Sequence, residues 1–272
     1  MDVGRGGRGA GAGPQAEIVY RDGVTTLAIL TAAGSGTRLG FDLPKALVPL
    51  RGLPLVLHAA RRLTASGVVD ALVVTAPNGL VSVMSDVLEH DPHVSVPVVV
   101  VAGGATRQSS VAAGLTRARP DIDTVVVHDA ARPLAPPAMI RRVVETVQAG
   151  HQAVIPGLAV VDTVKVVAPR GPAVDGQAAL APGVDRVAAT PARALLRAVQ
   201  TPQAFDRALL VRAHAAGAAR ARTEATAATD DASLVEALGE DVFVVEGDEL
   251  AMKVTTARDF YYIEKLLTED GR

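Results

Sequence analysis

Apolar segments rich in β-branched residues alternate along this chain with segments of helical period, and this alternation limits its fold more than any other feature. The apolar segments are TTLAIL (25–30), ALVVTA (71–76), VPVVVVA (96–102), DTVVVHDA (123–130), QAVIPGLA (152–159) and DVFVVEGD (241–248). The segments of helical period include 53–66, 106–118, 136–149 and 255–267. Strands that are apolar throughout are typical of parallel sheets covered on both faces. The sequence therefore predicts a single α/β, Rossmann-like domain with a mostly parallel sheet and helices on both faces.

The loops that leave these strands are the candidate binding site. Right-handed crossovers place the carboxyl ends of parallel strands at one edge of the sheet, where ligands of open α/β sheets bind. The loops that combine glycines, cations or carboxylates are AAGSGTRLGFDLPK (32–45), GGATRQSSV (103–111), HDAARP (128–133) and ELAMKVTTARD (249–259). Helix capping or turn formation explains one such loop, but it does not explain four of them at the same edge.

The first of these loops has the composition of an anion site. Its glycines allow backbone N–H groups to point at an oxyanion, and Arg38 and Lys45 can neutralise a polyphosphate from two sides. The spacing GSGTRLG is one residue longer than the dinucleotide fingerprint, and no Gly-Lys-Ser/Thr follows as in a Walker A loop. Taken alone, this loop is compatible with nucleotide binding and also with a structural turn.

Composition excludes several other classes of function. The chain has no cysteine, which rules out disulfides, thiolate zinc sites and cysteine nucleophiles. A net charge of −2 and 3% aromatic residues argue against a nucleic-acid surface. No apolar run reaches the roughly 18 residues of a membrane span, and the N-terminal residues lack the apolar stretch of a secretory signal. We therefore expect a cytoplasmic protein with no nucleic-acid partner and no membrane partner.

Two segments are expected to lie outside the packed core. Residues 1–22 are rich in glycine and arginine and predict a disordered tail, because such sequence buries too little surface to offset its ordering entropy. Residues 160–190 combine an alternating strand, a Pro/Gly-rich stretch and a second short strand. This predicts a projecting β-hairpin arm with a long loop, the alternative being a disordered surface insertion. The folded domain is then 23–272.

The motifs together resemble one enzyme family. They are AAGSGTRL with PKALVPL, GGATRQSSV, HDAARP, DTVK, VDR, TPQAF, TDDAS and MKVT. In this order, over about residues 24–268, they resemble the 2-C-methyl-D-erythritol 4-phosphate cytidylyltransferases. Many nucleotidyltransferases share the first motif, whereas HDAARP with VDR and TDDAS is much more specific. The chain departs from the family pattern at Ala105, an often acidic position, and in extra residues between Val167 and Val184.

The resemblance implies a reaction between two phosphates. CTP and 2-C-methyl-D-erythritol 4-phosphate would give a CDP-alcohol and pyrophosphate, through attack of the substrate phosphate on the α-phosphorus, without a protein nucleophile. Mg²⁺ would arrive with the CTP triphosphate and not at a protein metal site. Asp129 could contact the ion, the alternative being that it orders an arginine or the ribose hydroxyls. The alternatives are a nucleotidyltransferase for ribitol 5-phosphate or another sugar phosphate, and a non-catalytic nucleotide-binding regulator. Three retained cations, Arg38, Lys45 and Lys253, argue against the regulator.

The resemblance also assigns roles to individual residues. The implied catalytic residues are Arg38, Lys45, Arg186 and Lys253. The implied CTP-binding residues are Ala32, Ala33, Gly34, Gly104, Ser110, Asp129, Ala130 and Arg132. The implied substrate-binding residues are Asp129, Thr163, Arg186, Thr201, Thr229 and Lys253. Those in the arm would reach the substrate of a partner subunit, which implies a homodimer formed through 160–190. Local capping and cross-strand pairing remain the alternatives for the threonines and for Arg186.

Overall fold

The computed structural model of the chain describes residues 25–34, 41, 43–168 and 183–269. The predicted tail 1–22 and Arg38 lie outside the described residues. One half of the central sheet is parallel, in the order β5–β4–β1–β6. Its strands are β1 (Thr26–Thr31), β4 (Ala71–Ala76), β5 (Val98–Ala102) and β6 (Thr124–Asp129). Each lies within or next to an apolar segment of the sequence. The side chains of β1, β4 and β6 are nearly all buried, whereas β5, at the edge of the sheet, is buried only at Val99 and Val100.

The other half of the sheet is mixed. β11 (Gln203–Asp206) runs antiparallel between β6 and β7 (Ala153–Ala159). β10 (Arg197–Val199) also pairs antiparallel with β7, and β12 (Phe243–Glu246) pairs parallel with it. The predicted α/β fold with a mostly parallel sheet is therefore confirmed, and β10 and β11 are antiparallel strands that the pattern of apolar segments did not predict.

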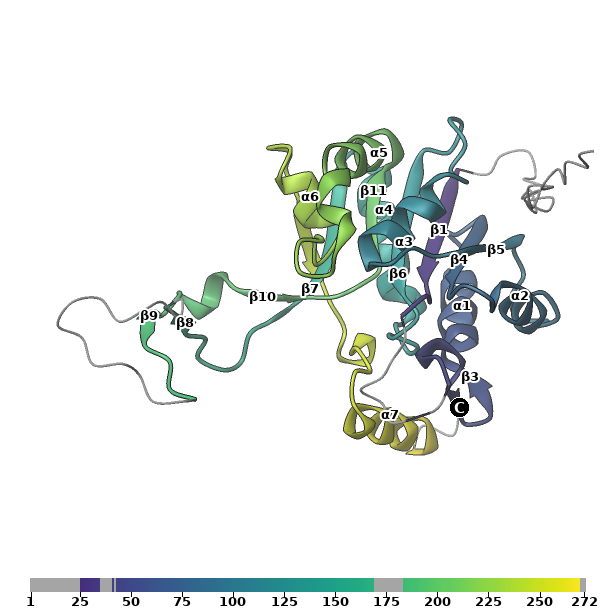
Figure 1. Ribbon diagram of the computed structural model, residues 1–272, viewed down its shortest axis with the longest axis horizontal. Coiled ribbons are helices and arrows are strands. Elements are labelled where there is room, and N and C mark those ends of the chain that lie inside the picture. Colours follow the sequence, from purple (N-terminus) through teal and green to yellow (C-terminus); the bar gives the residue numbers. More distant parts are fainter. Residues whose placement is uncertain (1–24, 35–40, 42, 169–182, 270–272) are drawn as a thin grey trace, which may run out of the picture.

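Helices cover both faces of the sheet (Figure 1). The helices on one face are α1 (Leu55–Ala65), α2 (Val81–Glu89) and α4 (Pro137–Gln148). The helices on the other face are α3 (Arg107–Leu115), α5 (Arg207–Ala216) and α6 (Ala232–Glu236). In β1, Ala28 and Leu30 belong to the first core and Leu27 and Ile29 to the second. This split follows from the pleat, because successive strand side chains point to opposite faces.

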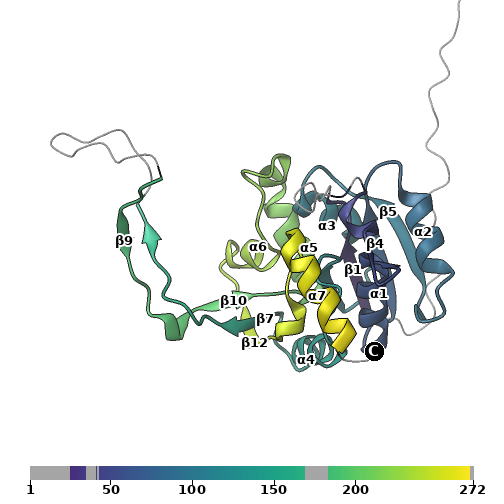
Figure 2. The ribbon, with the colours of Figure 1, turned by 90° about the horizontal axis from the view of Figure 1, so that it is seen from below.

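A smaller apolar cluster lies beside the carboxyl edge of the sheet. It joins the short strand β2 (Pro49–Leu50) and the start of α1 to α7 (Ala257–Glu269), through side chains that include Leu50, Leu55 and Ile263. The short strand β3 (Leu53–Pro54) pairs with β2. Figure 2 shows α7 crossing the molecule on this side. The remaining elements are the 3₁₀ turns η2 (Lys45–Leu47), η3 (Arg193–Leu195), η4 (Ala218–Arg222) and η5 (Glu249–Ala251). Because η2 and η5 adjoin this cluster, packing fixes the loops that carry Lys45 and Lys253.

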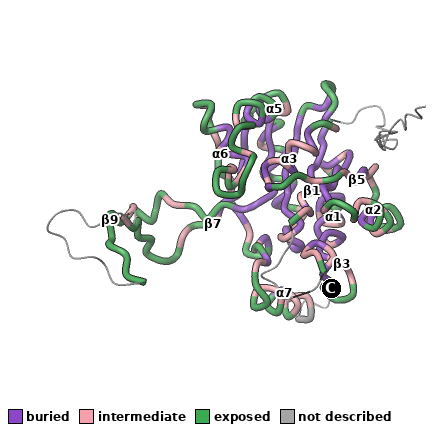
Figure 3. Tube along the Cα trace, viewed as in Figure 1, coloured by how far each residue is buried: buried purple, intermediate pink, exposed green. Residues whose placement is uncertain are grey.

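The described part of 160–190 is a ribbon that leaves the body of the molecule (Figures 1 and 2). β8 (Val166–Val167) and β9 (Val187–Ala189) pair antiparallel within it, and all of their side chains are exposed. Exposed apolar side chains such as Val161 at 81% and Leu195 at 83% accompany them. Figure 3 shows this contrast between the exposed ribbon and the buried sheet. Within the described ranges, no helix combines the length and the hydropathy that a membrane span requires.

Candidate functional site

A cleft of about 610 Å³ opens where β1, β5 and β6 end. The residues that follow these strands line it, together with the start of η2 and the segment after η5. The lining residues are Thr31, Ala32, Ala33, Gly34, Lys45, Ala46, Gly104, Ala105, Thr106, Arg107, Ser110, Asp129, Ala130, Ala131, Glu224, Lys253 and Thr255. The topology thus brings the glycine-bearing and cation-bearing loops of the sequence to one edge of the sheet.

A second cavity of about 210 Å³ lies beside the cleft. Its lining residues are Arg107, Asp129, Arg132, Val199, Gln200, Thr201, Gln203, Thr229, Asp230 and Lys253. Three of them, Arg107, Asp129 and Lys253, also line the cleft. These three charged side chains therefore lie at the boundary between the two cavities.

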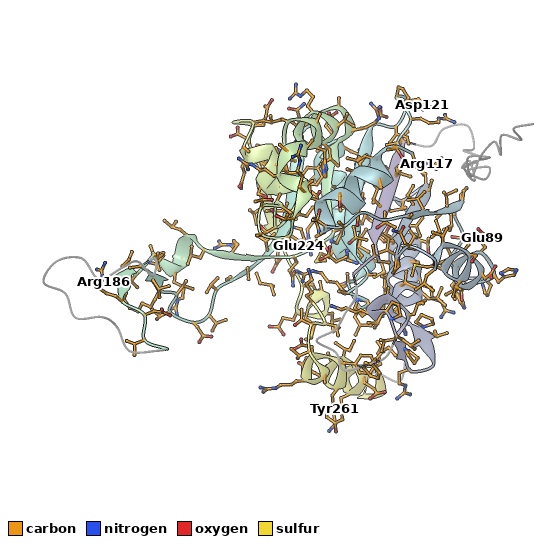
Figure 4. All side chains as sticks on the ribbon, in the orientation of Figure 1. Glu89, Arg117, Asp121, Arg186, Glu224 and Tyr261 are labelled. Atoms are coloured by element: carbon orange, nitrogen blue, oxygen red, sulfur yellow. The ribbon has the colours of Figure 1, made fainter. Side chains whose placement is uncertain are left out.

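Most residues that the sequence singled out lie at these cavities. Those that line one or both are Ala32, Ala33, Gly34, Lys45, Gly104, Ser110, Asp129, Ala130, Arg132, Thr201, Thr229 and Lys253. Arg38 belongs to a segment outside the described residues. Thr163 and Arg186 are exposed on the ribbon and line neither cavity in their own chain. Figure 4 shows Arg186 far out on the ribbon, whereas Glu224 lies on the body of the molecule.

Gly103 lets the loop after β5 approach the loop after β1, and Gly104 lets the same loop approach the start of α3. A Cβ atom on Gly103 would stand 2.5 Å from Cβ of Ala33, and one on Gly104 would stand 2.2 Å from Oγ of Ser109. The backbone N–H of Gly104 donates to Oγ of Ser110 at 3.1 Å, and Thr106 caps the N-terminus of α3. This wall of the cleft is therefore backbone, which suits the recognition of a flat or anionic group by N–H donors.

Asp129 lies at the centre of the charged boundary. Its Oδ1 accepts hydrogen bonds from Nε of Arg107 at 3.0 Å and from Oγ1 of Thr31 at 3.2 Å. Its Oδ2 accepts one from Nζ of Lys253 at 2.7 Å. Burial alone would raise the pKa of this carboxyl, but Arg107 and Lys253 outweigh it and hold the pKa well below its usual range. Asp129 is therefore an anion whose two oxygens are both engaged by cations.

Further charges continue inward from Asp129. NH1 of Arg107 donates to Oδ2 of Asp231 at 2.8 Å, and Oδ1 of Asp231 lies 2.8 Å from Nε2 of His214. Burial alone would lower the pKa of Arg107, but the carboxylates of Asp231 and Asp129 raise it above its usual value. Burial alone would likewise raise the pKa of Asp231, which Arg107 and His214 lower instead. A row of alternating charges thus connects Lys253 at the cavities to α5.

Four residues of the site carry no role predicted from the sequence: Arg107, His214, Glu224 and Asp231. Arg107 and Asp231 stand inside the quoted motifs GGATRQSSV and TDDAS, so the motifs were the signal that could have identified them. His214 lies on α5 and carries no local signal, because only tertiary packing brings it to Asp231. Glu224 comes from the loop after η4, whose Ala221 carbonyl accepts a hydrogen bond from Oγ1 of Thr106 at 3.0 Å.

The carboxylates of the site are too few to make a metal centre of their own. Among the residues that the structure describes, no group of three or more His, Asp or Glu side chains can hold a metal ion. Asp129 and Glu224 are the carboxylates that line the cleft. Mg²⁺ commonly keeps several waters and binds through one or two carboxylates plus substrate phosphates. Such a donor set would suit a metal ion that is carried by a polyphosphate better than one that protein ligands hold alone.

His128 holds the loop after β6 in place. Oγ1 of Thr201 accepts a hydrogen bond from the backbone N–H of Asp129 at 3.1 Å and lies 2.9 Å from Nδ1 of His128. The other ring nitrogen lies 3.2 Å from the carbonyl oxygen of Arg132. With Nδ1 accepting and Nε2–H donating, the ring is neutral, which agrees with its complete burial. Burial lowers its pKa from 6.5 to about 4.

We predict that His128 makes the fold sensitive to mild acid. Below pH 6.5 the unfolded chain takes up a proton that the folded chain does not bind until the pH approaches 4. The free energy of unfolding should therefore fall as the pH drops through this window, by at most about 3 kcal/mol from this residue. The free energy of unfolding, measured with urea at several pH values, should change less with pH in His128→Asn than in the wild type. An equal dependence of the free energy of unfolding on pH for wild type and His128→Asn would contradict the prediction.

Comparisons with known proteins agree on one family. The family model of 2-C-methyl-D-erythritol 4-phosphate cytidylyltransferase (IspD) matches residues 26–269. The chain is 47% identical over 246 residues to the Streptomyces avermitilis protein of that name, covering 90% of this chain and 92% of the relative. It is 49% identical over 243 residues to the Nocardia farcinica protein of the same name, covering 89% and 94%. The crystal structure of 4-diphosphocytidyl-2C-methyl-D-erythritol synthase from Anaerococcus prevotii superposes with a TM-score of 0.72 at 27% identity, covering 91% of this chain and 100% of that one.

Proposed function

The chain belongs to the 2-C-methyl-D-erythritol 4-phosphate cytidylyltransferase family, and we propose that its cleft holds the nucleotide while the second cavity holds the alcohol phosphate. The reaction transfers a cytidylyl group from CTP to 2-C-methyl-D-erythritol 4-phosphate. Its products are 4-diphosphocytidyl-2-C-methyl-D-erythritol, an isoprenoid precursor of the methylerythritol phosphate pathway, and pyrophosphate. The observation that carries the assignment of the cavities is that Lys253 lines both of them.

The chemistry needs two anions to meet. An oxygen of the substrate phosphate forms a bond to the α-phosphorus of CTP, and the bond from that phosphorus to the bridging oxygen of the pyrophosphate breaks. The electron pair of the broken bond leaves with pyrophosphate, so no protein nucleophile is required. Lys253, at the boundary of the cavities, is placed to bind the attacking phosphate and the α-phosphate together. Lys45 in the cleft neutralises the triphosphate, and Arg38 is proposed to do so with it.

The remaining walls of the cleft are proposed to bind the rest of CTP. Backbone groups at Ala32, Ala33, Gly34 and Gly104, with the hydroxyl of Ser110, face the base and ribose. Ala130 and Asp129 complete this wall, and Arg132 borders the alcohol phosphate from the second cavity. NH1 of Arg132 donates to the carbonyl oxygen of Ala251 at 2.6 Å, which orients the guanidinium and ties it to the turn before Lys253.

A magnesium ion is proposed to enter with CTP. When it is bound, the ion supplies charge neutralisation and polarises the phosphoryl oxygens. Asp129 is the carboxylate best placed to contact it, and Lys253 now holds one oxygen of that carboxylate. A carboxylate oxygen has two lone pairs, so Asp129 would hold the ion while Lys253 keeps its hydrogen bond to the same carboxylate. CTP is a cytoplasmic metabolite, so we also propose that the enzyme acts in the cytoplasm.

The exposed ribbon is proposed to complete the site of a second subunit. Thr163 and Arg186 match the family's substrate-positioning residues, yet they line neither cavity in their own chain. The ribbon also exposes apolar side chains, including Val161 and Leu195, and unpaired strand edges that a second chain can cover. In a two-fold homodimer, each ribbon would bring Thr163 and Arg186 to the neighbour's site, and the neighbour would cover the exposed side chains and strand edges. Thr201 and Thr229 line the second cavity from the chain's own body.

The alternative substrate class is ribitol 5-phosphate or another sugar phosphate. We predict that the protein releases pyrophosphate from CTP with 2-C-methyl-D-erythritol 4-phosphate, and only when a divalent cation is present. The test measures pyrophosphate release for each of the four nucleoside triphosphates against erythritol, ribitol and sugar phosphates. Equal turnover of ribitol 5-phosphate would reject the substrate assignment. Full activity after treatment with a chelator would reject the magnesium proposal and leave the transferase assignment intact.

A further inference from the structure

We propose that Asp231 and His214 are positioning residues, which act through Arg107 and Asp129 to hold the ammonium group of Lys253 at the boundary of the two cavities. This inference rests on the role proposed above for Lys253. Neither Asp231 nor His214 lines the cleft or the second cavity. Their effect on the reaction must therefore pass through side chains that do.

The row of contacts is continuous and short. Lys253 donates to Asp129 at 2.7 Å, Arg107 donates to Asp129 at 3.0 Å, and Arg107 donates to Asp231 at 2.8 Å. His214 completes the row at 2.8 Å from Asp231. These residues come from the loop after β12, the end of β6, the start of α3, the N-cap of α6 and the last turn of α5. Four elements besides its own segment thus set the position of the ammonium group of Lys253.

The inner end of this row is rigid. Asp231 is 1% exposed, and its backbone N–H and that of Ala232 both donate to Oε1 of Gln203 at 3.2 Å. Gln203 is itself completely buried on β11. The carboxylate of Asp231 is therefore anchored to the sheet, and it offers Arg107 a fixed partner on the side away from the cavities.

Removing the carboxylate of Asp231 changes how Arg107 distributes its N–H donors. With two carboxylates, the guanidinium divides its donors: Nε bonds Asp129 and NH1 bonds Asp231. With asparagine at 231, the guanidinium keeps a single buried carboxylate and turns more of its donors toward Asp129. An arginine in bidentate contact with a carboxylate is a stronger partner than a lysine. Asp129 then follows Arg107, and Lys253 loses its fixed position at the reacting phosphates.

The inner histidine contributes by holding Asp231. Its Nε2 contacts Oδ1 of Asp231, while its Nδ1 is buried and has no hydrogen-bond partner among the described residues. The contact with Asp231 is therefore the polar interaction that orients the ring. Glutamine can reproduce a donor at the position of Nε2, whereas leucine fills similar space without one. Comparing His214→Gln with His214→Leu separates the donor from the packing.

The test is a double-mutant cycle between Asp231 and Lys253. Asp231→Asn should lower kcat by about 10-fold, while KM for CTP changes by less than about 3-fold, because positioning matters most in the transition state. In the Lys253→Ala background the same substitution should change kcat by less than about 2-fold, since the group that it positions is gone. His214→Leu should lower kcat in the same way, and His214→Gln should restore it to within about 2-fold of wild type.

Asp91→Asn is the matched control. It breaks an ion pair of the same kind, in which Nε of Arg61 on α1 donates to Oδ1 of Asp91 at 3.0 Å, and neither residue lines the cleft or the second cavity. It should leave kcat unchanged in both backgrounds, although the melting temperature falls. Melting curves are recorded for all variants. If Asp231→Asn does not fold, His214→Leu and His214→Gln take its place in the double-mutant cycle with Lys253→Ala.

The outcomes separate this inference from the function on which it rests. If Lys253→Ala keeps wild-type kcat, the role of Lys253 is rejected and the inference falls with it. If Lys253→Ala is impaired but Asp231→Asn lowers kcat by the same factor in both backgrounds, the transferase site stands and the positioning role is overturned. Equal kcat for His214→Leu and His214→Gln likewise overturns the role of the histidine donor.

Discussion

Replacing Lys45 with alanine is expected to lower kcat by about 100-fold or more, the loss that follows removal of one stabiliser of transition-state charge. Lys45 begins η2 and lines the cleft, and its neighbour Ala46 is buried. The turn should therefore keep its position after the side chain is truncated. The same loss is expected for Arg38→Ala, whose residue lies outside the described part of the chain.

Steady-state kinetics with CTP as the varied substrate distinguish catalysis from binding. A loss in kcat with a small change in KM places Lys45 at the transition state, whereas a rise in KM alone would show that it binds the ground state only. Lys265 on α7 is a suitable control, because it is an exposed lysine whose Nζ lies 5.6 Å from the ring centre of Tyr261. Lys265→Ala should retain wild-type kcat, and circular dichroism should show both variants folded.

Dimers that pair a Lys45→Ala chain with an Arg186→Ala chain are expected to recover about half of the wild-type activity. In a two-fold dimer with arms that act in trans, one site of such a mixed dimer receives both lesions and the other receives none. Each variant alone should be nearly inactive, because every site then carries a lesion. Differently tagged chains, unfolded and refolded together, allow the mixed dimers to be purified by two affinity steps before the assay.

The reciprocal dimer carries the same two substitutions on one chain. Pairing a wild-type chain with a Lys45→Ala, Arg186→Ala double variant places one lesion in each site when the arm acts in trans, so activity should be nearly absent. If the arm instead folds onto its own chain, this dimer keeps one intact site and the first kind of dimer keeps none. The two dimers have identical composition, and the order of their activities therefore decides between the two arrangements.

Much of the fold follows from local sequence. Strands such as 71–76 and 124–129 are apolar on both faces, so they can be stable only inside a sheet covered by helices. The crossovers between them then bring the loops at Gly104, Asp129 and Lys253 to one edge. The motifs by which the chain resembles its family fall in the same loops. Short β11 escaped prediction because its four residues carry no long apolar run, and its antiparallel place between β6 and β7 depends on the path of the chain.

By itself, then, the sequence determined the layered α/β architecture, the sheet edge at which the cleft opens and the family to which the chain belongs, because each of these depends on local periodicity or on short motifs. The tertiary structure decided which charges meet. Arg107 and Asp231 are 124 residues apart in the chain, as are Asp129 and Lys253, and no periodicity relates them. Their contacts exist because separate strands and helices pack in one register around a buried carboxylate, and burial makes each partner depend on the next.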